Sequence, residues 1–166
     1  MSKEAYRDPL TCVGSKTAYT RRISEMIEHI SKKEEPLFAI VMVDVNGLKQ
    51  VNDNYGHTFG DSYLKGSSHI ICDIYKHSPV YRIGGDEFVV ILEGEDYEKR
   101  QSRLSDLKAA FDRSYNNTSA DPWKRYSAAA GMAEYAFDDN SVELVFKRAD
   151  KAMYEDKMEF KKRNSR

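Results

Sequence analysis

The chain has 166 residues, 40% of them hydrophobic, and its 26 basic residues nearly balance its 27 acidic ones. This composition indicates a single globular domain and argues against a disordered chain or a broad nucleic-acid-binding surface. There is no apolar run near the roughly 20 residues of a membrane-spanning helix and no signal-peptide pattern. Two isolated cysteines, Cys12 and Cys72, favour a reducing setting. We therefore expect a cytoplasmic protein, or the cytoplasmic part of a membrane-anchored sensor whose membrane and sensory segments lie outside this chain.

The first half of the chain predicts two helix-forming regions around one strand. A loop over residues 8–14 leads into a helix over 15–33. The run LFAIVMVDV at 37–45 is almost continuously apolar and rich in β-branched residues. It therefore predicts a central strand that is buried on both faces. An Asn-Gly breaker follows, and then a short helix over 48–54 and a longer one over 60–76.

The second half begins with a predicted hairpin, because Gly-Gly-Asp-Glu separates strand-forming runs at 80–83 and 88–92. The remaining expected elements are a helix over 95–115, a strand over 125–135, a helix from Asp139 to about Phe160, and a frayed basic tail.

The expected order is a helix, then β-α-β-β-α-β, then a helix, which contains the split βαβ unit of ferredoxin-like folds. We therefore predict an α+β domain over residues 1–166, with a lead-in over 1–7 and a basic tail over 158–166. Its sheet should be mainly antiparallel, with helices packed around it. Right-handed crossovers place the strand at 88–92 beside the strand at 37–45 and antiparallel to it. The end of one then meets the start of the other.

Three acidic side chains should converge where these two strands meet: Asp44, Asp86 and Glu87. Like charges a few ångströms apart repel one another and raise one another's pKa unless a cation lies between them. Mg²⁺ binds one or two carboxylates plus substrate phosphates, and two such ions can promote an in-line phosphoryl displacement. The carbonyl of Val45 offers a further oxygen ligand. The sequence thus predicts a magnesium site at this edge of the sheet.

Gly84 and Gly85 would let phosphates approach the backbone beside these acids, because glycine carries no Cβ. The alternative is that the glycines and acids form only a solvated turn, as in many hairpins. Asp44 favours the metal site, because an acid at the end of a long apolar run rarely serves packing.

The segment DVNGLKQVNDNYGHTFGD, which starts at Asp44, carries a second group of candidates. Lys49 can neutralise phosphate charge. Asn52 and Asp61 can read the Watson–Crick edge of guanine, since a carboxylate accepts two N–H donors. The alternative is that Asn52 and Asp61 only cap helices.

Four blocks of the sequence resemble the GGDEF family of diguanylate cyclases. RIGGDEF at 82–88 is similar to the signature that names the family. DPLT at 8–11, the segment at 44–61 and RADKAMYEDK at 148–157 resemble its other motifs, in the same order. The resemblance implies a palm-like, nucleotide-cyclase-type domain that joins two GTP molecules into cyclic di-GMP and releases pyrophosphate. It also implies Mg²⁺, with Mn²⁺ possible, and a homodimer in which each 3′-hydroxyl attacks the other nucleotide's α-phosphate.

The resemblance also implies roles for individual residues. The implied metal ligands are Asp44, the Val45 carbonyl and Asp86. The implied catalytic residues are Asp86, Glu87 and Lys49. The implied substrate-binding residues are Asn52, Asp61, Gly84, Gly85, Lys157 and Lys161.

The sequence departs from the family pattern at three places. Asn46 stands where the family has a second aspartate, so metal affinity is expected to be lower. Lys161 stands where the family has an arginine, and lysine cannot make a bidentate phosphate contact. Arg163 is the alternative source of a guanidinium. Tyr75 and Ser78 stand where the family has the arginine and aspartate of a feedback site, so we expect no product inhibition there.

Three functions are compatible with these observations. The first is an active diguanylate cyclase domain of a larger, sensor-containing protein. The second is a GTP-binding but inactive regulatory module, favoured by Asn46 and by the missing arginine. The third is a related palm enzyme that uses another nucleotide such as ATP, against which Asn52 and Asp61 argue.

Overall fold

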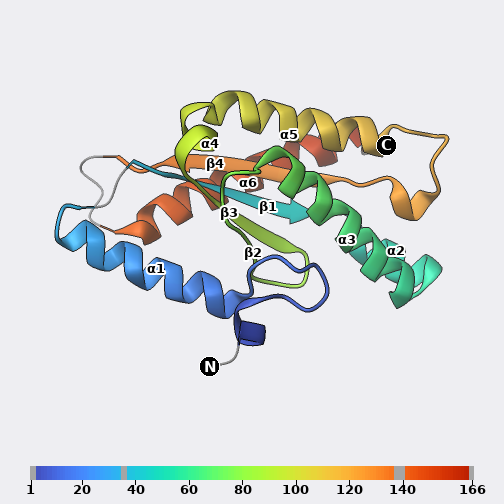
Figure 1. The fold of residues 1–166 in the computed structure, drawn as a ribbon. Coiled ribbons are helices and arrows are strands. Elements are labelled where there is room, and N and C mark those ends of the chain that lie inside the picture. Colours follow the sequence, from blue (N-terminus) through green and yellow to red (C-terminus); the bar gives the residue numbers. More distant parts are fainter. Residues whose placement is uncertain (1–2, 35–36, 137–140, 165–166) are drawn as a thin grey trace.

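The computed structural model describes residues 3–34, 37–136 and 141–164. Its centre is a four-stranded sheet in the order β2-β3-β1-β4, with helices on both faces (Figure 1). All neighbouring strands are antiparallel, and β3 lies between β2 and β1. The α+β fold and the predicted antiparallel pairing of β3 with β1 are therefore confirmed. The strands are β1 (Ala39–Val45), β2 (Val80–Arg82), β3 (Glu87–Leu92) and β4 (Ala128–Glu134).

The helices that surround the sheet follow the predicted order. They are α1 (Lys16–Ser31), α2 (Leu48–Tyr55), α3 (His57–Ile74), α4 (Gly94–Glu98), α5 (Arg100–Tyr115) and α6 (Val142–Asn164), with 3-10 turns η1 (Lys3–Tyr6) and η2 (Pro122–Lys124). Within the described ranges, none of these helices has the length and apolar character needed to cross a membrane.

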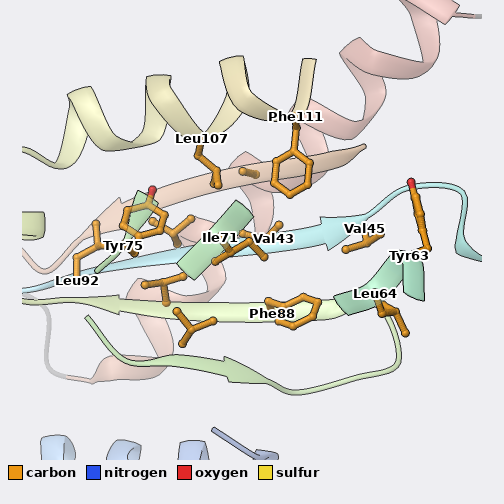
Figure 2. Close-up of a cluster of buried hydrophobic side chains, with 14 of the residues drawn as sticks. Val43, Val45, Tyr63, Leu64, Ile71, Tyr75, Phe88, Leu92, Leu107 and Phe111 are labelled. Atoms are coloured by element: carbon orange, nitrogen blue, oxygen red, sulfur yellow. The ribbon is translucent and has the colours of Figure 1, made fainter. Parts of the chain in front are cut away.

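Strand β1 is buried on both faces, as predicted, because its residues alternate between two apolar clusters. Val41 and Val43 belong to the cluster under α3 and α5, where Leu107 and Phe111 reach from α5 toward the sheet (Figure 2). Ile40 and its alternating neighbours belong to the cluster under α1 and α6. The apolar run thus holds the last residues of β1 at a fixed place between two helical layers.

Two predicted helix boundaries are wrong. Helix α3 begins at His57 rather than Gly60, because the interruption after α2 is the single residue Gly56, whose φ is 98°. The helix expected over 95–115 is two helices, α4 and α5, separated at Lys99.

The prediction of a frayed tail is also wrong, since α6 continues to Asn164. The ring of Phe160 packs against Tyr115 of α5, with ring centroids 5.3 Å apart, and the Asn164 side chain donates to the Phe160 carbonyl at 2.8 Å. These contacts explain the extra helical turn. The expected helix start at Asp139 lies outside the described residues.

Helix α6 lies very close to β4. A Cβ added to Gly131 of β4 would collide with the backbone nitrogen of Met153 and with Ala152. Only glycine permits this approach. The contact fixes the height of α6 over the sheet, and Lys157 follows one helical turn after Met153.

Candidate active site

The end of β1 and the start of β3 meet as expected. Asp44 is paired with Glu87 in the sheet register. The backbone N–H of the next residue, Val45, donates to the carbonyl of Asp86 at 2.8 Å. Asp44 is only 7% exposed although it is the last acid of an apolar strand. Burial of a carboxylate requires a compensating partner.

Lys157 of α6 supplies part of that compensation. Its ammonium lies 2.8 Å from one oxygen of Asp44, and this hydrogen bond raises the pKa of Lys157. The other oxygen, Oδ1, is buried and has no hydrogen-bond partner among the described residues. A buried, unpartnered carboxylate oxygen fits a cation that completes the site.

The negative charge of Asp44 also affects the pKa of Asp86 and the pKa of Glu87. Burial, and then the nearby Asp44, raise the pKa of Asp86. Burial, and then the charges of Asp44, Asp86 and Asp150, raise the pKa of Glu87. The predicted meeting of three mutually repelling carboxylates is therefore present at this edge.

These acids do not form a complete metal cage by themselves. Within the described residues, no group of three His, Cys, Asp or Glu side chains is placed to hold a metal ion. Mg²⁺ commonly completes its coordination with water and substrate phosphates. Asp44 and Asp86, with the Val45 carbonyl, therefore suit an ion that arrives with a phosphorylated ligand.

A cleft of about 580 Å³ opens beside the acidic edge. It brings together five of the predicted site residues from separate elements: Val45, Lys49, Asp86, Lys157 and Lys161. The cleft thus combines an acidic edge with several basic side chains.

The other predicted residues lie outside the lining of this cleft. Gly84 and Gly85 line a smaller depression beside Arg82. Asn52 lies against Gly60, where any Cβ would collide with the Asn52 amide, and the neighbouring Asp61 is exposed. The two proposed guanine readers are thus close along the α2–α3 corner.

The glycine turn is held by residues to which the sequence analysis gave no role. The Arg82 guanidinium donates to the Gly85 carbonyl at 2.8 Å and pairs with Asp8 at 3.3 Å. Asp8 also accepts bonds from the backbone N–H and the hydroxyl of Thr11. Burial raises the pKa of Asp8, but these bonds and Arg82 outweigh it, so the pKa is lowered. Arg82, which stands just before the Gly84-Gly85 pair, was the feature of the sequence that could have indicated this contact.

Asn46 is engaged in structural hydrogen bonds. Its side-chain amide donates to the Ser127 hydroxyl at 3.1 Å. Its backbone N–H donates to the Ser127 carbonyl at 2.8 Å, and its carbonyl accepts from the Tyr63 hydroxyl at 2.6 Å. Asn46, which stands where the resemblance implies an aspartate, therefore joins the end of β1 to the start of β4.

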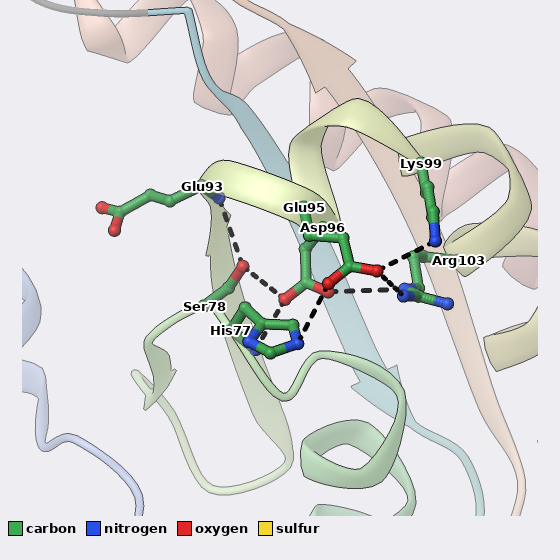
Figure 3. A network of polar contacts seen from close by, with 7 residues as sticks. All are labelled: His77, Ser78, Glu93, Glu95, Asp96, Lys99 and Arg103. Carbon is green, nitrogen blue, oxygen red and sulfur yellow. Dashed lines mark hydrogen bonds and ion pairs between the residues drawn. The ribbon is translucent and has the colours of Figure 1, made fainter.

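Tyr75 and Ser78 are also built into the fold. Tyr75 is 1% exposed. The Ser78 hydroxyl donates to Asp96 at 2.8 Å, and the buried Asp96 also accepts from the backbone of His77 and pairs with Arg103 (Figure 3). Neither position presents an accessible charged group. The expected absence of product inhibition through these positions stays a prediction.

Comparisons with known proteins agree with this geometry. The sequence matches the family described as "Diguanylate cyclase, GGDEF domain" over residues 5–163. It is 31% identical over 159 residues to the diguanylate cyclase DgcS of Shewanella oneidensis. The match covers 95% of this chain and 51% of DgcS, so the chain spans about half the length of that relative.

Two solved structures share the fold. The GGDEF domain of DgcB from Caulobacter crescentus, solved in complex with c-di-GMP, has a TM-score of 0.78 at 22% identity, covering 95% of this chain and 90% of that one. Diguanylate cyclase SiaD from Pseudomonas aeruginosa, in complex with its activator SiaC, has a TM-score of 0.76 at 24% identity, covering 95% and 60%. The palm-type fold is thereby confirmed, and the chain belongs to the GGDEF-domain family.

Proposed function

We propose that this chain is a diguanylate cyclase domain, which joins two GTP molecules into cyclic di-GMP and releases pyrophosphate. The observation that carries the proposal is the Asp44 carboxylate. It is buried near Asp86, which lines the basic cleft, and one of its oxygens has no partner among the described residues.

Asp44, Asp86 and the Val45 carbonyl would hold Mg²⁺, with Mn²⁺ as an alternative. When bound, the metal would favour ionisation of the attacking 3′-hydroxyl and stabilise charge on the α-phosphate. Glu87, paired with Asp44 in the register, would support the metal or orient that hydroxyl.

The remaining candidates would bind the nucleotide. Lys49, Lys157 and Lys161 line the cleft, where they would neutralise phosphate charge. Asn52 and Asp61 would read guanine, and Gly84 and Gly85 would let phosphate oxygens approach the backbone.

The reaction requires two copies of the domain. Each domain would bind one GTP, and each 3′-oxygen would form a bond to the other nucleotide's α-phosphorus while the bond to pyrophosphate breaks. We propose a homodimer that works in the cytoplasm on GTP. Control by a sensory domain elsewhere in a longer protein stays a prediction.

The second candidate is a GTP-binding regulatory module without catalysis. Two observations favour it: Asn46 uses its amide to bond Ser127, and Lys161 stands in the cleft where the family has an arginine.

Product analysis distinguishes these functions. The purified chain is incubated with Mg²⁺ and GTP, ATP or both, and the nucleotides are then separated. We expect cyclic di-GMP and pyrophosphate from GTP, no turnover of ATP alone, and loss of turnover in Asp86→Ala with an unchanged fold. Asp112→Ala, which changes an exposed acid on α5, is the matched control. Binding of GTP without its consumption would support the regulatory module, and unchanged turnover in Asp86→Ala would reject the metal assignment.

A further inference from the structure

The cleft has a further wall whose residues lie outside the family motifs. The connection between α5 and β4 contributes Pro122, Arg125 and Ser127 to its lining. Arg125 was not among the residues that the sequence singled out. It lines the same cleft as Lys49 of α2 and Lys161 of α6.

Arg163, the guanidinium expected to substitute for the missing arginine, lies elsewhere. It lines a separate cavity with Asp112 and Asn116 rather than the cleft. Among the described arginines that line a cavity, Arg125 is therefore the one that shares a cleft with Asp86.

The Arg125 side chain is fixed by its own loop. Its Nε donates to the Ala120 carbonyl at 2.9 Å, and Nη2 donates to the Thr118 carbonyl at 3.0 Å. A guanidinium has five N–H donors in one plane, so these bonds orient it and leave three donors. Within the described ranges no carboxylate pairs with Arg125, and an oriented guanidinium with spare donors suits an anion.

The backbone on both sides of Arg125 is anchored. The Trp123 ring packs against Phe59 and Tyr55, with centroids 4.5 Å and 5.2 Å apart. The Ser127 backbone N–H donates to the Tyr63 hydroxyl at 3.2 Å. Arg125 is thus held between two fixed points, which reduces the entropy lost when it binds a ligand.

The charges that line the cleft favour a polyanion. Four basic side chains line it, and Asp86 is the acidic one among the described residues of its lining. One of the four, Lys157, is already paired with Asp44. We infer that Arg125 is a triphosphate-binding residue, which supplies from the α5–β4 connection the guanidinium that α6 does not bring to the cleft. This inference rests on the proposed function.

Binding measurements test the inference without turnover. Guanosine 5′-(α,β-methylene)triphosphate with Mg²⁺, which cannot release pyrophosphate, is titrated calorimetrically into wild type and into Arg125→Ala, Arg125→Lys and Arg163→Ala variants. We expect Arg125→Ala to weaken binding about tenfold or more, because a hydrogen-bonded charge contact is lost. The affinity of Arg125→Lys should lie between those of wild type and Arg125→Ala. Arg163→Ala should bind the analogue like wild type. Arg113→Ala, an exposed arginine on α5, is the control.

A parallel titration with GMP separates phosphate binding from a structural effect. We expect Arg125→Ala to weaken the triphosphate analogue much more than GMP, with a melting temperature close to that of wild type. Equal losses for both ligands, no loss in Arg125→Ala, or a loss confined to Arg163→Ala would each overturn the inference. Absence of any guanine-nucleotide binding by wild type would instead reject the proposed function, on which the inference depends.

Discussion

At the scale of single residues, the acidic edge is only partly neutralised in the protein alone. Lys157 balances Asp44, but Asp86 has its pKa raised by burial and by Asp44. A raised carboxyl pKa means that the folded protein holds this proton more tightly than the unfolded chain. Stability therefore falls as pH rises through the range above the ordinary value of 3.8. At neutral pH the ionised Asp86 opposes folding and favours binding of a cation.

Asp86→Asn should accordingly separate stability from activity. We expect turnover to vanish while the melting temperature at pH 7, measured in a chelator, rises by about 1–2 °C, since a partly exposed charge has a small, screened effect. The rise should shrink as the pH approaches 4, where the wild-type carboxyl is increasingly protonated. Asp112→Asn serves as the control. A variant that melts lower than wild type at pH 7 would contradict the electrostatic argument.

Lys157→Met removes the side-chain cation that contacts Asp44 among the described residues, and it leaves a buried carboxylate unpaired. We expect the free energy of unfolding, from urea titration, to fall by about 1–3 kcal/mol. Millimolar Mg²⁺ should restore more stability to this variant than it adds to wild type. Lys151→Met, which changes an exposed lysine on the same helix, should behave like wild type. Equal Mg²⁺ effects in both proteins would mean that Lys157 and the cation do not share Asp44.

At the scale of helices and strands, the site depends on how α6 sits on β4. Gly131 permits backbone contact with Met153, and the following helical turn brings Lys157 over the end of β1. A side chain at Gly131 would push the helix away from the sheet. Stability and the Asp44 contact should therefore change together.

Gly131→Ala tests this dependence. We expect it to cost about 1–3 kcal/mol of unfolding free energy, because overpacking against backbone atoms cannot be relieved by a side-chain rotation. Gly85→Ala is the stability control, since a Cβ there meets nothing within 4 Å. A Gly131→Ala protein as stable as wild type would show that α6 can shift at no cost.

The same elements show how far the sequence could predict the structure. The apolar run of β1, the Gly-Gly turn before β3 and the right-handed crossover rule together predicted that β3 pairs with β1, and this pairing places Asp44 beside Glu87. The extra turn of α6 could not be predicted, because it depends on Phe160 meeting Tyr115 across the fold. Arg125 escaped notice for the same reason, since its place in the cleft is set by tertiary contacts rather than by a local pattern.

At the scale of the whole molecule, the described residues of one domain form the basic cleft beside Asp86, whereas the proposed product needs two GTP molecules. Activity should therefore require association of two copies. We expect the initial rate to rise with the square of protein concentration when dimers are scarce, and linearly when they dominate. Rates measured over a hundredfold concentration range, together with sedimentation, check this. A rate that is linear throughout, in a protein that sediments as a monomer, would contradict the dimeric mechanism.

Product feedback is the second property of the whole molecule. The Asp96 network occupies the surroundings of Ser78 (Figure 3). Tyr75 is buried. We expect cyclic di-GMP to leave the initial rate unchanged at concentrations well above those formed in the assay. If product does inhibit, Ser78→Ala should leave that inhibition intact, because this position would not be its cause. Relief of inhibition by Ser78→Ala would contradict the structural role.

The backbone contact between Gly131 and Met153 also fixes the rotation of α6 about its own axis. Each residue of an α-helix turns the chain by about 100°. A single residue inserted between Met153 and Lys157 would therefore carry the ammonium around the helix and away from Asp44, although every side chain of the site would still be present. The count of residues from the glycine contact to the lysine is thus as much a part of the site as the lysine itself.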